Sequence, residues 1–396
     1  MRRFAHRILP VALSAATLAG VGAFGVSSSG GAAAAPTPPG PPAAPPAPPA
    51  PPGTAGYVYV STNSPAGNAV QVFERQANGT LADDGAPVPT GGIGSGSAGG
   101  QGSVTLSSDG RTLLVVNEGT GSVTTSSVSD FAVGPNGGLT LRNTVPSGGL
   151  NPISVAISGN LVEVLNAGSA TVPGSVVGFS ALPQGLAAIT AGSRSLPFVA
   201  SQNSLEDVTV NQGGSEVVVT DKGLNTVDTL GVRPGGTLGT VATTPGNSTG
   251  AYASVFAEDG QLLVVDAGQS AVSSYVFGPG GSLDATQAPL PDSQSAACWI
   301  ANGHRNDAFV ANAASGSVSS YLVLGDGTLA FVGNTSLPGT GAKPLDDAVS
   351  SDGSHLFVVD EANHQVDTFA VGNSGRLALV GETTTASTTP LGIAAS

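Results

Sequence analysis

The sequence predicts an all-β protein, a seven-bladed β-propeller with four antiparallel strands in each blade. Three observations support this: a composition typical of strands and turns, a motif that recurs seven times, and two chain ends that complete one blade. The clearest copy of the motif spans residues 345–383 and holds four short apolar runs, separated by an Asp-Gly, an acidic turn and a Gly-Asn-Ser-Gly turn. Runs of this length between Gly, Asn and Asp are typical of antiparallel strands joined by short connections.

The composition favours strands and limits the possible partners. Of the 396 residues only 10% are charged, whereas 58 are Gly and 29 are Pro. Helical bundles draw on Glu, Lys, Leu and Ala, so this chain fits many short strands better. The formal net charge of −14 argues against nucleic acid and anionic membrane surfaces, because both require a basic face. A single cysteine, Cys298, excludes an internal disulfide.

The first 55 residues predict export rather than a folded domain. Residues 1–35 combine a basic start, an apolar stretch and small residues suited to cleavage, which is typical of a signal peptide. The alternative is an uncleaved anchor helix, the one route by which we expect membrane association. Residues 36–55 form a Pro-rich linker that favours extended polyproline II. We therefore expect a propeller over residues 56–396 in a secreted or envelope-associated, extracytoplasmic protein.

Each copy of the motif marks its fourth strand with a glycine one or two residues before a leucine. The seven glycines are Gly79, Gly138, Gly185, Gly236, Gly281, Gly327 and Gly375. The leucines run from Leu81 to Leu377, which is 296 residues over six intervals, or about 49 per repeat. That spacing is in the range of propeller blades. The third strands recur with it at 69–75, 127–133, 175–181, 226–232, 271–277, 317–323 and 365–371.

The chain ends predict how the ring closes. Six first strands precede their second strands in order, but the N-terminal copy begins directly at a second strand, near Tyr57. The seventh first strand, residues 391–396, stands alone at the C-terminus. We expect it to pair beside residues 57–60, so that both ends share one blade and leave no free edge at the seam.

The repeat resembles a known family. The stretch LSSDGRTLLVVNEGTGSV (106–123) and its echo SSDGSHLFVVDEANHQV (350–366) are similar to YVTN-type, lactonase-like seven-bladed propellers of the 6-phosphogluconolactonase family, in its secreted actinobacterial form. The resemblance covers the chain from about Tyr57 to Ser396. It implies the propeller fold and, for an enzyme, lactone hydrolysis with Arg, His and Glu around the mouth of the central channel.

This sequence departs from that pattern at the channel. The stretches leading into its first strands contain neither arginine nor histidine, and only Glu118 stands where the family often has an Asn-Glu pair. A lactone carbonyl or a phosphate would then lack an evident cationic stabiliser.

Four other sequence features are better explained without function. Residues 246–250 fit G-x-S-x-G and residues 94–99 fit G-x-G-x-x-G, but neither lies between a predicted strand and a predicted helix. His304 and His355 fall at hairpins, so we expect solvated turn residues. An Asn or Asp ends each second strand, where it can stabilise a turn or a left-handed backbone. These residues are Asn63, Asn117, Asn166, Asp221, Asp266, Asn312 and Asp360.

Residues that break the repeat at the start of the first strands are the candidate site. They are Gln101, Glu206, Asp207, Tyr252, Cys298, Trp299, Asp346 and Asp347. The acidic pairs Glu206–Asp207 and Asp346–Asp347 suit a Ca²⁺ or Mg²⁺ ion, and the alternative is that they cap strand N–H groups or face solvent. Gln101, Tyr252, Cys298 and Trp299 would line a binding site at the channel mouth, with Cys298 expected as a buried small residue rather than a nucleophile.

The sequence leaves three functions open. The favoured one is a monomeric binding or scaffold module at the cell envelope, whose partner is a small polar ligand, a wall component or a protein. The second is a lactone hydrolase with Glu118, Glu206, Asp207, Asp346 or Asp347 as a base toward water. The third is a structural surface protein that binds no small molecule.

Overall fold

The computed structural model describes residues 53–97, 99–200, 202 and 204–396. The predicted signal peptide and most of the predicted linker lie outside these residues. Strand β1 begins at Thr54, within the range expected as linker. No helix in the described part of the chain is long and apolar enough to cross a membrane.

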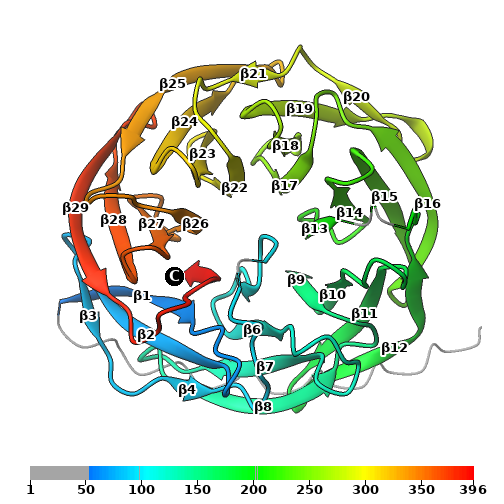
Figure 1. Ribbon diagram of the computed structural model, residues 1–396, viewed down its shortest axis with the longest axis horizontal. Coiled ribbons are helices and arrows are strands. Elements are labelled where there is room, and N and C mark those ends of the chain that lie inside the picture. The colour runs from blue at the N-terminus through cyan, green and yellow to red at the C-terminus, as the bar shows by residue number, and fades with distance from the viewer. Residues whose placement is uncertain (1–52, 98, 201, 203) are drawn as a thin grey trace, which may run out of the picture. The chain divides into compact units, whose positions relative to one another are not determined.

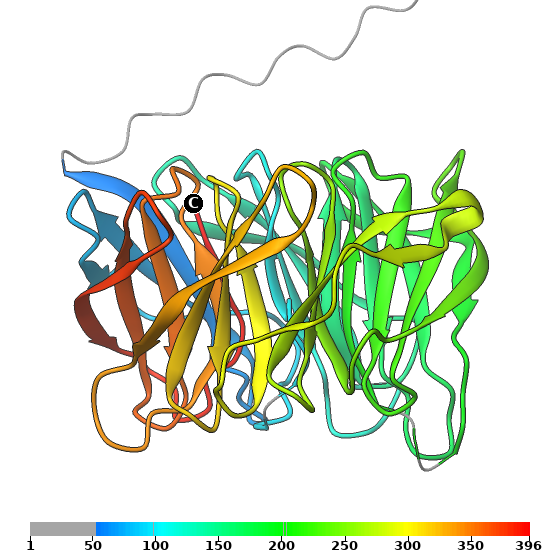
Figure 2. The same ribbon diagram turned by 90° about the horizontal axis from the view of Figure 1, so that it is seen from above.

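Seven antiparallel sheets stand around a centre like the blades of a propeller (Figure 1). The first strands lie nearest the centre, and seen from the side the strands run between the two faces of the ring (Figure 2). The first strands are β5 (Val104–Leu106), β9 (Pro152–Ser158), β13 (Leu205–Val210), β17 (Ala251–Phe256), β22 (Ala297–Asn302), β26 (Pro344–Val349) and β30 (Ile393–Ala395). The second strands are β1 (Thr54–Ser61), β6 (Thr112–Asn117), β10 (Leu161–Asn166), β14 (Glu216–Asp221), β18 (Leu262–Asp266), β23 (Asp307–Asn312) and β27 (His355–Asp360).

The outer strands complete each blade. The third strands are β2 (Ala69–Gln76), β7 (Ser127–Val133), β11 (Ser175–Leu182), β15 (Thr226–Arg233), β19 (Ala271–Phe277), β24 (Ser317–Val323) and β28 (Gln365–Val371). The fourth strands are β3 (Leu81–Asp83) with β4 (Val88–Pro89), β8 (Leu139–Pro146), β12 (Gly185–Ser195), β16 (Thr237–Pro245), β20 (Leu283–Ala285) with β21 (Leu290–Pro291), β25 (Leu329–Ser336) and β29 (Leu377–Thr384). We number the blades 1 to 7 from β1, so that blade 2 begins at β5 and blade 7 at β26. The predicted seven-bladed fold is confirmed.

The predicted seam is confirmed as well. β30 pairs antiparallel with β1, with Ile393 opposite Val60 and Ala395 opposite Val58. Beyond the strand, the Ser396 N–H donates to Tyr57 O at 2.9 Å and the Ser61 N–H donates to Gly392 O at 3.0 Å. Because Ile393 is buried, the last strand contributes apolar packing as well as hydrogen bonds.

The recurring glycine has a backbone cause. In every blade the glycine before the fourth strand has a φ between 70° and 124°, a region that residues with a Cβ rarely adopt. In blade 2 this residue is Gly137, not Gly138 as predicted, because Gly137 has the positive φ and closes the turn onto Gly134 O at 3.0 Å. The repeat therefore records a turn that each blade needs.

The buried core lies between neighbouring blades. Apolar side chains of the first three strands form clusters there, such as Val162, Val164 and Phe179 of blade 3 with Leu114 and Val128 of blade 2. Such inter-blade packing explains why one meander could not fold alone.

Two predictions about polar residues were confirmed only in part. Asp221 and Asp360 accept hydrogen bonds from the N–H groups of Leu224 and Asn363 in the turns that follow, as expected, but the left-handed backbone does not recur. Of the seven Asn and Asp residues at the second strands, only Asn63 has a positive φ. The others are buried strand ends, and Asn117 shows their role, since its Nδ2 donates to Ser129 Oγ on the next strand at 2.8 Å. His355 is buried rather than solvated, because it begins β27 and packs against Gly79 of the next blade. His304 is exposed, as predicted.

Candidate functional site

The chain itself fills the centre of the ring. Residues 99–103 precede β5, and this segment reaches toward the middle of the propeller (Figure 1, cyan). The Gln101 amide Nε2 donates to Ser254 O at 3.1 Å, and its Oε1 accepts from the Ile300 N–H at 2.7 Å. These two partners lie on β17 and β22, in blades 5 and 6. Gln101 is only 8% exposed, so the predicted ligand-binding residue acts as a plug that joins distant blades.

Glycines let the segment pass between the first strands. A side chain at Gly100 would collide with the carbonyl of Glu206, and one at Gly102 would approach the Ser154 hydroxyl. Gly102 has a φ of +70° and accepts a hydrogen bond from the Val155 N–H at 2.9 Å. The Gly-rich sequence therefore fits a close passage through the channel better than a flexible loop.

One rim of the channel holds an ion pair against an aromatic pair. Lys222 Nζ lies 2.5 Å from Glu206 Oε1 and 4.8 Å from the centre of the Tyr252 ring. The Tyr252 and Trp299 rings meet edge to face, with centroids 5.4 Å apart. Burial raises the pKa of Glu206 even though Lys222 opposes the shift. Tyr252 and Trp299 are both buried, so they pack as core rather than offering a stacking surface.

Asp207 ties three first strands together. Its Oδ1 accepts from Ser154 Oγ at 3.0 Å, and its Oδ2 accepts from the N–H and the hydroxyl of Ser254 at 2.9 and 2.8 Å. The three residues lie on β13, β9 and β17. Burial raises the pKa of Asp207 to about 7. The side chain therefore caps strand groups, which was one of the two alternatives expected.

Asp346 and Asp347 are buried in blade 7 rather than facing solvent. Asp346 Oδ1 accepts from the Asp347 N–H at 3.1 Å, and burial raises the pKa of Asp346 to about 8, with Asp207 adding to the shift. Neither carboxyl oxygen of Asp347 has a hydrogen-bond partner, and burial together with Asp346 raises its pKa well above the ordinary value. Among the residues described, no group of three or more His, Cys, Asp or Glu is placed to hold a metal ion.

The remaining predicted residues do not complete a catalytic group. Glu118 borders a cavity of about 10 Å³ beside Ser103 and Leu391, too small for a substrate. Burial raises its pKa, and the Ser95 hydroxyl opposes the shift. Burial also raises the pKa of Cys298 to about 12. A thiol with so high a pKa is a weak nucleophile at neutral pH. Cys298 packs against the core as expected, but it is half-buried rather than buried.

Two acidic residues were missed by the sequence analysis. Glu163 lies in the middle of β10, fully buried, with no partner for either carboxyl oxygen, and burial raises its pKa to about 8. The signal was a charge inside the apolar run LVEVLN, opposite a glycine, Gly178, in the paired strand. Glu216 begins β14 and borders a cleft of about 740 Å³ between blades 4 and 5.

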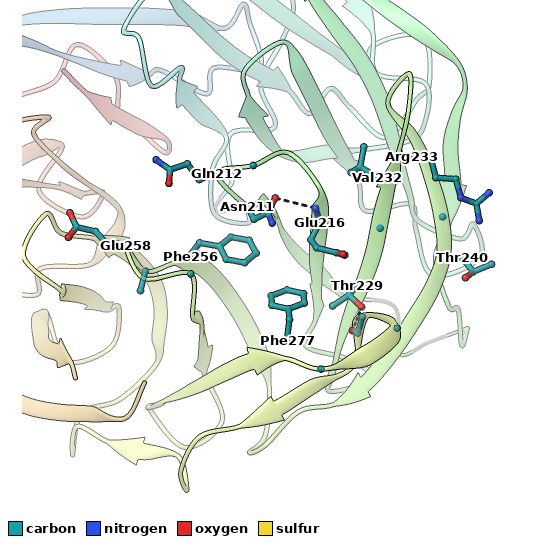
Figure 3. Close-up of a pocket in the computed structure, with 18 residues that line it drawn as sticks. Asn211, Gln212, Glu216, Thr229, Val232, Arg233, Thr240, Phe256, Glu258 and Phe277 are labelled. Atoms are coloured by element: carbon teal, nitrogen blue, oxygen red, sulfur yellow. Dashed lines mark hydrogen bonds between the residues drawn. The ribbon is translucent and has the colours of Figure 1, made fainter. Parts of the chain in front are cut away.

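That cleft has an aromatic wall and an acidic wall. Phe256 and Phe277 of blade 5 stack with ring centroids 5.9 Å apart and form one wall, and Glu216 lies on the facing wall in blade 4, with its carboxyl group near Gly231 (Figure 3). Seven of the 18 lining residues are glycines, which leaves peptide groups accessible. The cleft lies among the hairpins that follow the first and third strands of blades 4 and 5 and contains none of the residues predicted at the channel mouth.

Neither a protein-family model nor a curated protein sequence matches this chain. Solved structures with a similar fold include the periplasmic gluconolactonase of Pseudomonas aeruginosa, at 19% identity and a TM-score of 0.69 over 85% of this chain and 98% of that one. Candidate 6-phosphogluconolactonases from Bacteroides fragilis and Bacteroides uniformis are both 17% identical, with TM-scores of 0.65 and 0.68 over 86% of this chain and 98% and 99% of theirs. The chain thus has the fold of lactonase-like seven-bladed propellers.

Proposed function

We propose that this protein is an exported propeller that acts as a binding module at the cell envelope and does not hydrolyse lactones in its channel. The observation that carries the proposal is the filled channel, in which Gln101 bonds to Ser254 and Ile300 on the far side. A substrate would have to break these contacts before it reached the carboxylates of Asp207 or Asp346. Membership of the YVTN-type family and the monomeric state belong to the same proposal.

The chemistry of the rim supports this choice. Lactone hydrolysis needs a base that reaches water and a donor or cation for the developing oxyanion. The acceptor sites of Asp207 are occupied by Ser154 and Ser254, and the rim cation, Lys222, is paired with Glu206. The buried carboxylates thus hold strands together, which a binding scaffold requires and a hydrolase does not.

The envelope location rests on the first 55 residues of the sequence. Their basic and apolar start followed by a Pro-rich tract would place the propeller outside the cytoplasm and away from its anchor or wall. The partner would be a small ligand, a wall component or another protein. A cell-fractionation experiment tests this: the full chain should appear outside the cytoplasm, and loss of residues 1–35 should retain it inside.

Lactone hydrolysis is the second candidate. It is favoured by the likeness in fold to the Pseudomonas aeruginosa gluconolactonase and by Glu206, a carboxylate with a raised pKa beside the cation of Lys222. Such a pair would supply a general base and an electrostatic partner.

A panel of five- and six-membered lactones, with and without a phosphate group, separates the two candidates. We expect hydrolysis by the purified protein to stay at the buffer rate between pH 6 and pH 8. Turnover that is lost in Glu206→Gln but kept in the exposed control Glu258→Gln would establish the hydrolase instead. A rise in melting temperature with added Ca²⁺, lost in Asp346→Ala and Asp347→Ala, would likewise establish the predicted cation site.

A further inference from the structure

The cleft between blades 4 and 5 arises where one blade departs from the common pattern. In six blades, one residue of the second strand accepts a backbone hydrogen bond from the residue that follows the first strand. These residues are Tyr57, Thr112, Glu216, Gln261, Asp307 and His355. In blades 2 and 4 to 7 this bond closes the first hairpin, and in blade 1 it joins the C-terminal Ser396 to Tyr57. Because the hydrogen bond defines the position, their side chains can be compared directly from blade to blade.

In four of these blades the side chain at this position fills the gap to the next blade. Tyr57, Gln261, Asp307 and His355 each pack against the left-handed glycine of the following blade. In blade 4 the contacts nearest to the corresponding glycine, Gly281, come instead from Thr229 and Ala242. Glu216 thus leaves unfilled the space that its counterparts occupy, because its carboxyl oxygens lie near Gly231 of its own blade, and the cleft of about 740 Å³ remains. Cavities of this volume are in the usual range for small-molecule sites.

The polar groups of the cleft leave one carboxyl oxygen in need of a donor. Glu216 Oε2 is buried and has no hydrogen-bond partner. Neighbouring polar side chains are already engaged, since Thr229 Oγ1 donates to Gly281 O at 2.5 Å and Asn211 Oδ1 accepts from the Ser215 N–H at 2.8 Å. Arg233 lines the cleft but points away from the phenyl rings (Figure 3). The Glu216 side chain as a whole is only partly buried, so a bound cationic donor could pair with its carboxylate and offset the cost of the unpartnered oxygen.

The aromatic wall suits the same kind of ligand. Phe256 and Phe277 are partly exposed and stack beside the carboxyl group. Aromatic faces attract cations and also bury apolar surface. A neutral sugar would instead need several converging polar side chains with free bonding capacity. Thr229 and Asn211 are engaged. Gln212 and Thr240 also line the cleft but extend away from the phenyl rings (Figure 3).

We propose that this cleft binds an organic ammonium ion with an apolar body, with the ammonium group on Glu216 and the body against Phe256 and Phe277. The inference rests on the proposed function as a binding module and names its ligand chemistry. No residue of the channel segment 99–103 lines the cleft, so that binding requires no change at the channel plug.

The test is isothermal titration calorimetry of the full chain with 2-phenylethylammonium and with 2-phenylethanol, its neutral counterpart, at pH 8. We expect the ammonium ion to bind at least tenfold more tightly than the alcohol. Glu216→Gln should weaken ammonium binding about tenfold to hundredfold, the range of a charge-assisted hydrogen bond, and Phe277→Leu should weaken both probes. Asp259→Asn, which removes an equal charge from an exposed residue outside the lining, should change the affinity less than twofold.

Three results would overturn the inference: no binding up to 10 mM (about the weakest useful affinity for so small a probe), equal binding of the alcohol, or unchanged affinity in Glu216→Gln. Tighter binding of a neutral methyl hexoside than of the ammonium ion would overturn it too. Melting curves of each variant establish that it is folded. The lactone assay is independent of these outcomes, because its carboxylates lie at the channel, so a failure of the cleft and a failure of the binding-module proposal are separable.

Discussion

Replacing Glu163 by glutamine should remove one defined contribution to the pH dependence of the protein's stability. Glu163 is fully buried in β10, opposite Gly178, where a Cβ would lie 3.3 Å from its Oε1. Glutamine has nearly the same shape and carries no titratable charge. The substitution therefore tests burial of an ionisable group while leaving the packing of blade 3 in place.

The magnitude follows from the shifted pKa. Burial raises the pKa of Glu163 from its ordinary value of 4.5 to about 8. The folded protein then holds a proton that the unfolded chain releases, so this contribution to stability is complete below pH 4.5 and is lost as the pH rises to about 8. At 1.36 kcal/mol per pKa unit, wild type should lose roughly 4 kcal/mol between pH 5 and pH 8.5 through this group. Glu163→Gln should not.

Thermal unfolding at pH 5, 7 and 8.5 measures the difference. With an unfolding entropy of about 2.1 cal/mol/K per residue, a propeller of this size changes by about 0.7 kcal/mol per degree. The melting temperature of Glu163→Gln relative to wild type should therefore rise by about 6 °C between pH 5 and pH 8.5. Other buried carboxyls titrate in both proteins and cancel. A relative shift below about 1 °C, or an equal shift in the exposed control Glu258→Gln, would refute the reasoning.

Three further predictions concern the plug, the thiol and the seam. Gln101→Ala should lower stability by about 2–4 kcal/mol, because it leaves a buried donor and a buried acceptor unpaired, whereas the exposed Gln212→Ala should not; equal melting temperatures would refute the plug. Cys298 should react with iodoacetamide at pH 8 at least about a thousandfold more slowly than free cysteine, given its raised pKa, unless the protein is first unfolded. Ile393→Ala should cost about 2–5 kcal/mol, since it opens a cavity at the ring closure, whereas Leu379→Ala on the exposed face of β29 should cost under about 0.5 kcal/mol; a similar cost at both positions would contradict the seam's role.

The fold could be predicted because the repeat records local backbone requirements. Each blade needs one residue with positive φ before its fourth strand, and glycine meets that need at a fixed spacing. The ring closure could also be predicted from the sequence, because residues 391–396 form a first strand that no following blade uses, and Tyr57 lies in a blade that begins without a first strand. Turn chemistry and strand order are properties of short stretches, so a single sequence reveals them.

The centre of the ring was only half predictable. The irregular residues Gln101, Glu206 and Asp346 were identified correctly as residues that the repeat does not explain, and all three are buried around the channel. Their role in joining distant blades could not be predicted from the sequence. The hydrogen-bond partners of Gln101, for example, lie 153 and 199 residues away in the chain. A glutamine in a Gly-rich stretch looks the same whether it binds a ligand or crosses a channel. Only the packing of three blades distinguishes the two.

The cleft escaped prediction for a different reason, since it results from a contact that is missing. The residue at the hairpin-closing position is Tyr, Thr, Glu, Gln, Asp or His in the six blades compared, so Glu216 does not stand out in the sequence. Its consequence appears only in the structure, where Gly281 contacts Thr229 instead.

The residues that break the repeat at the first strands lie around the channel, and the channel is filled. Blades 2 and 4 depart from the common pattern in opposite ways. Residues 99–103 of blade 2 close the centre of the ring, whereas Glu216 of blade 4 leaves the gap to blade 5 open. In the closed centre the carboxylates bind strand groups and are not accessible to a ligand. In the cleft one carboxyl oxygen of Glu216 has no hydrogen-bond donor. The cleft is therefore the better candidate for a ligand site.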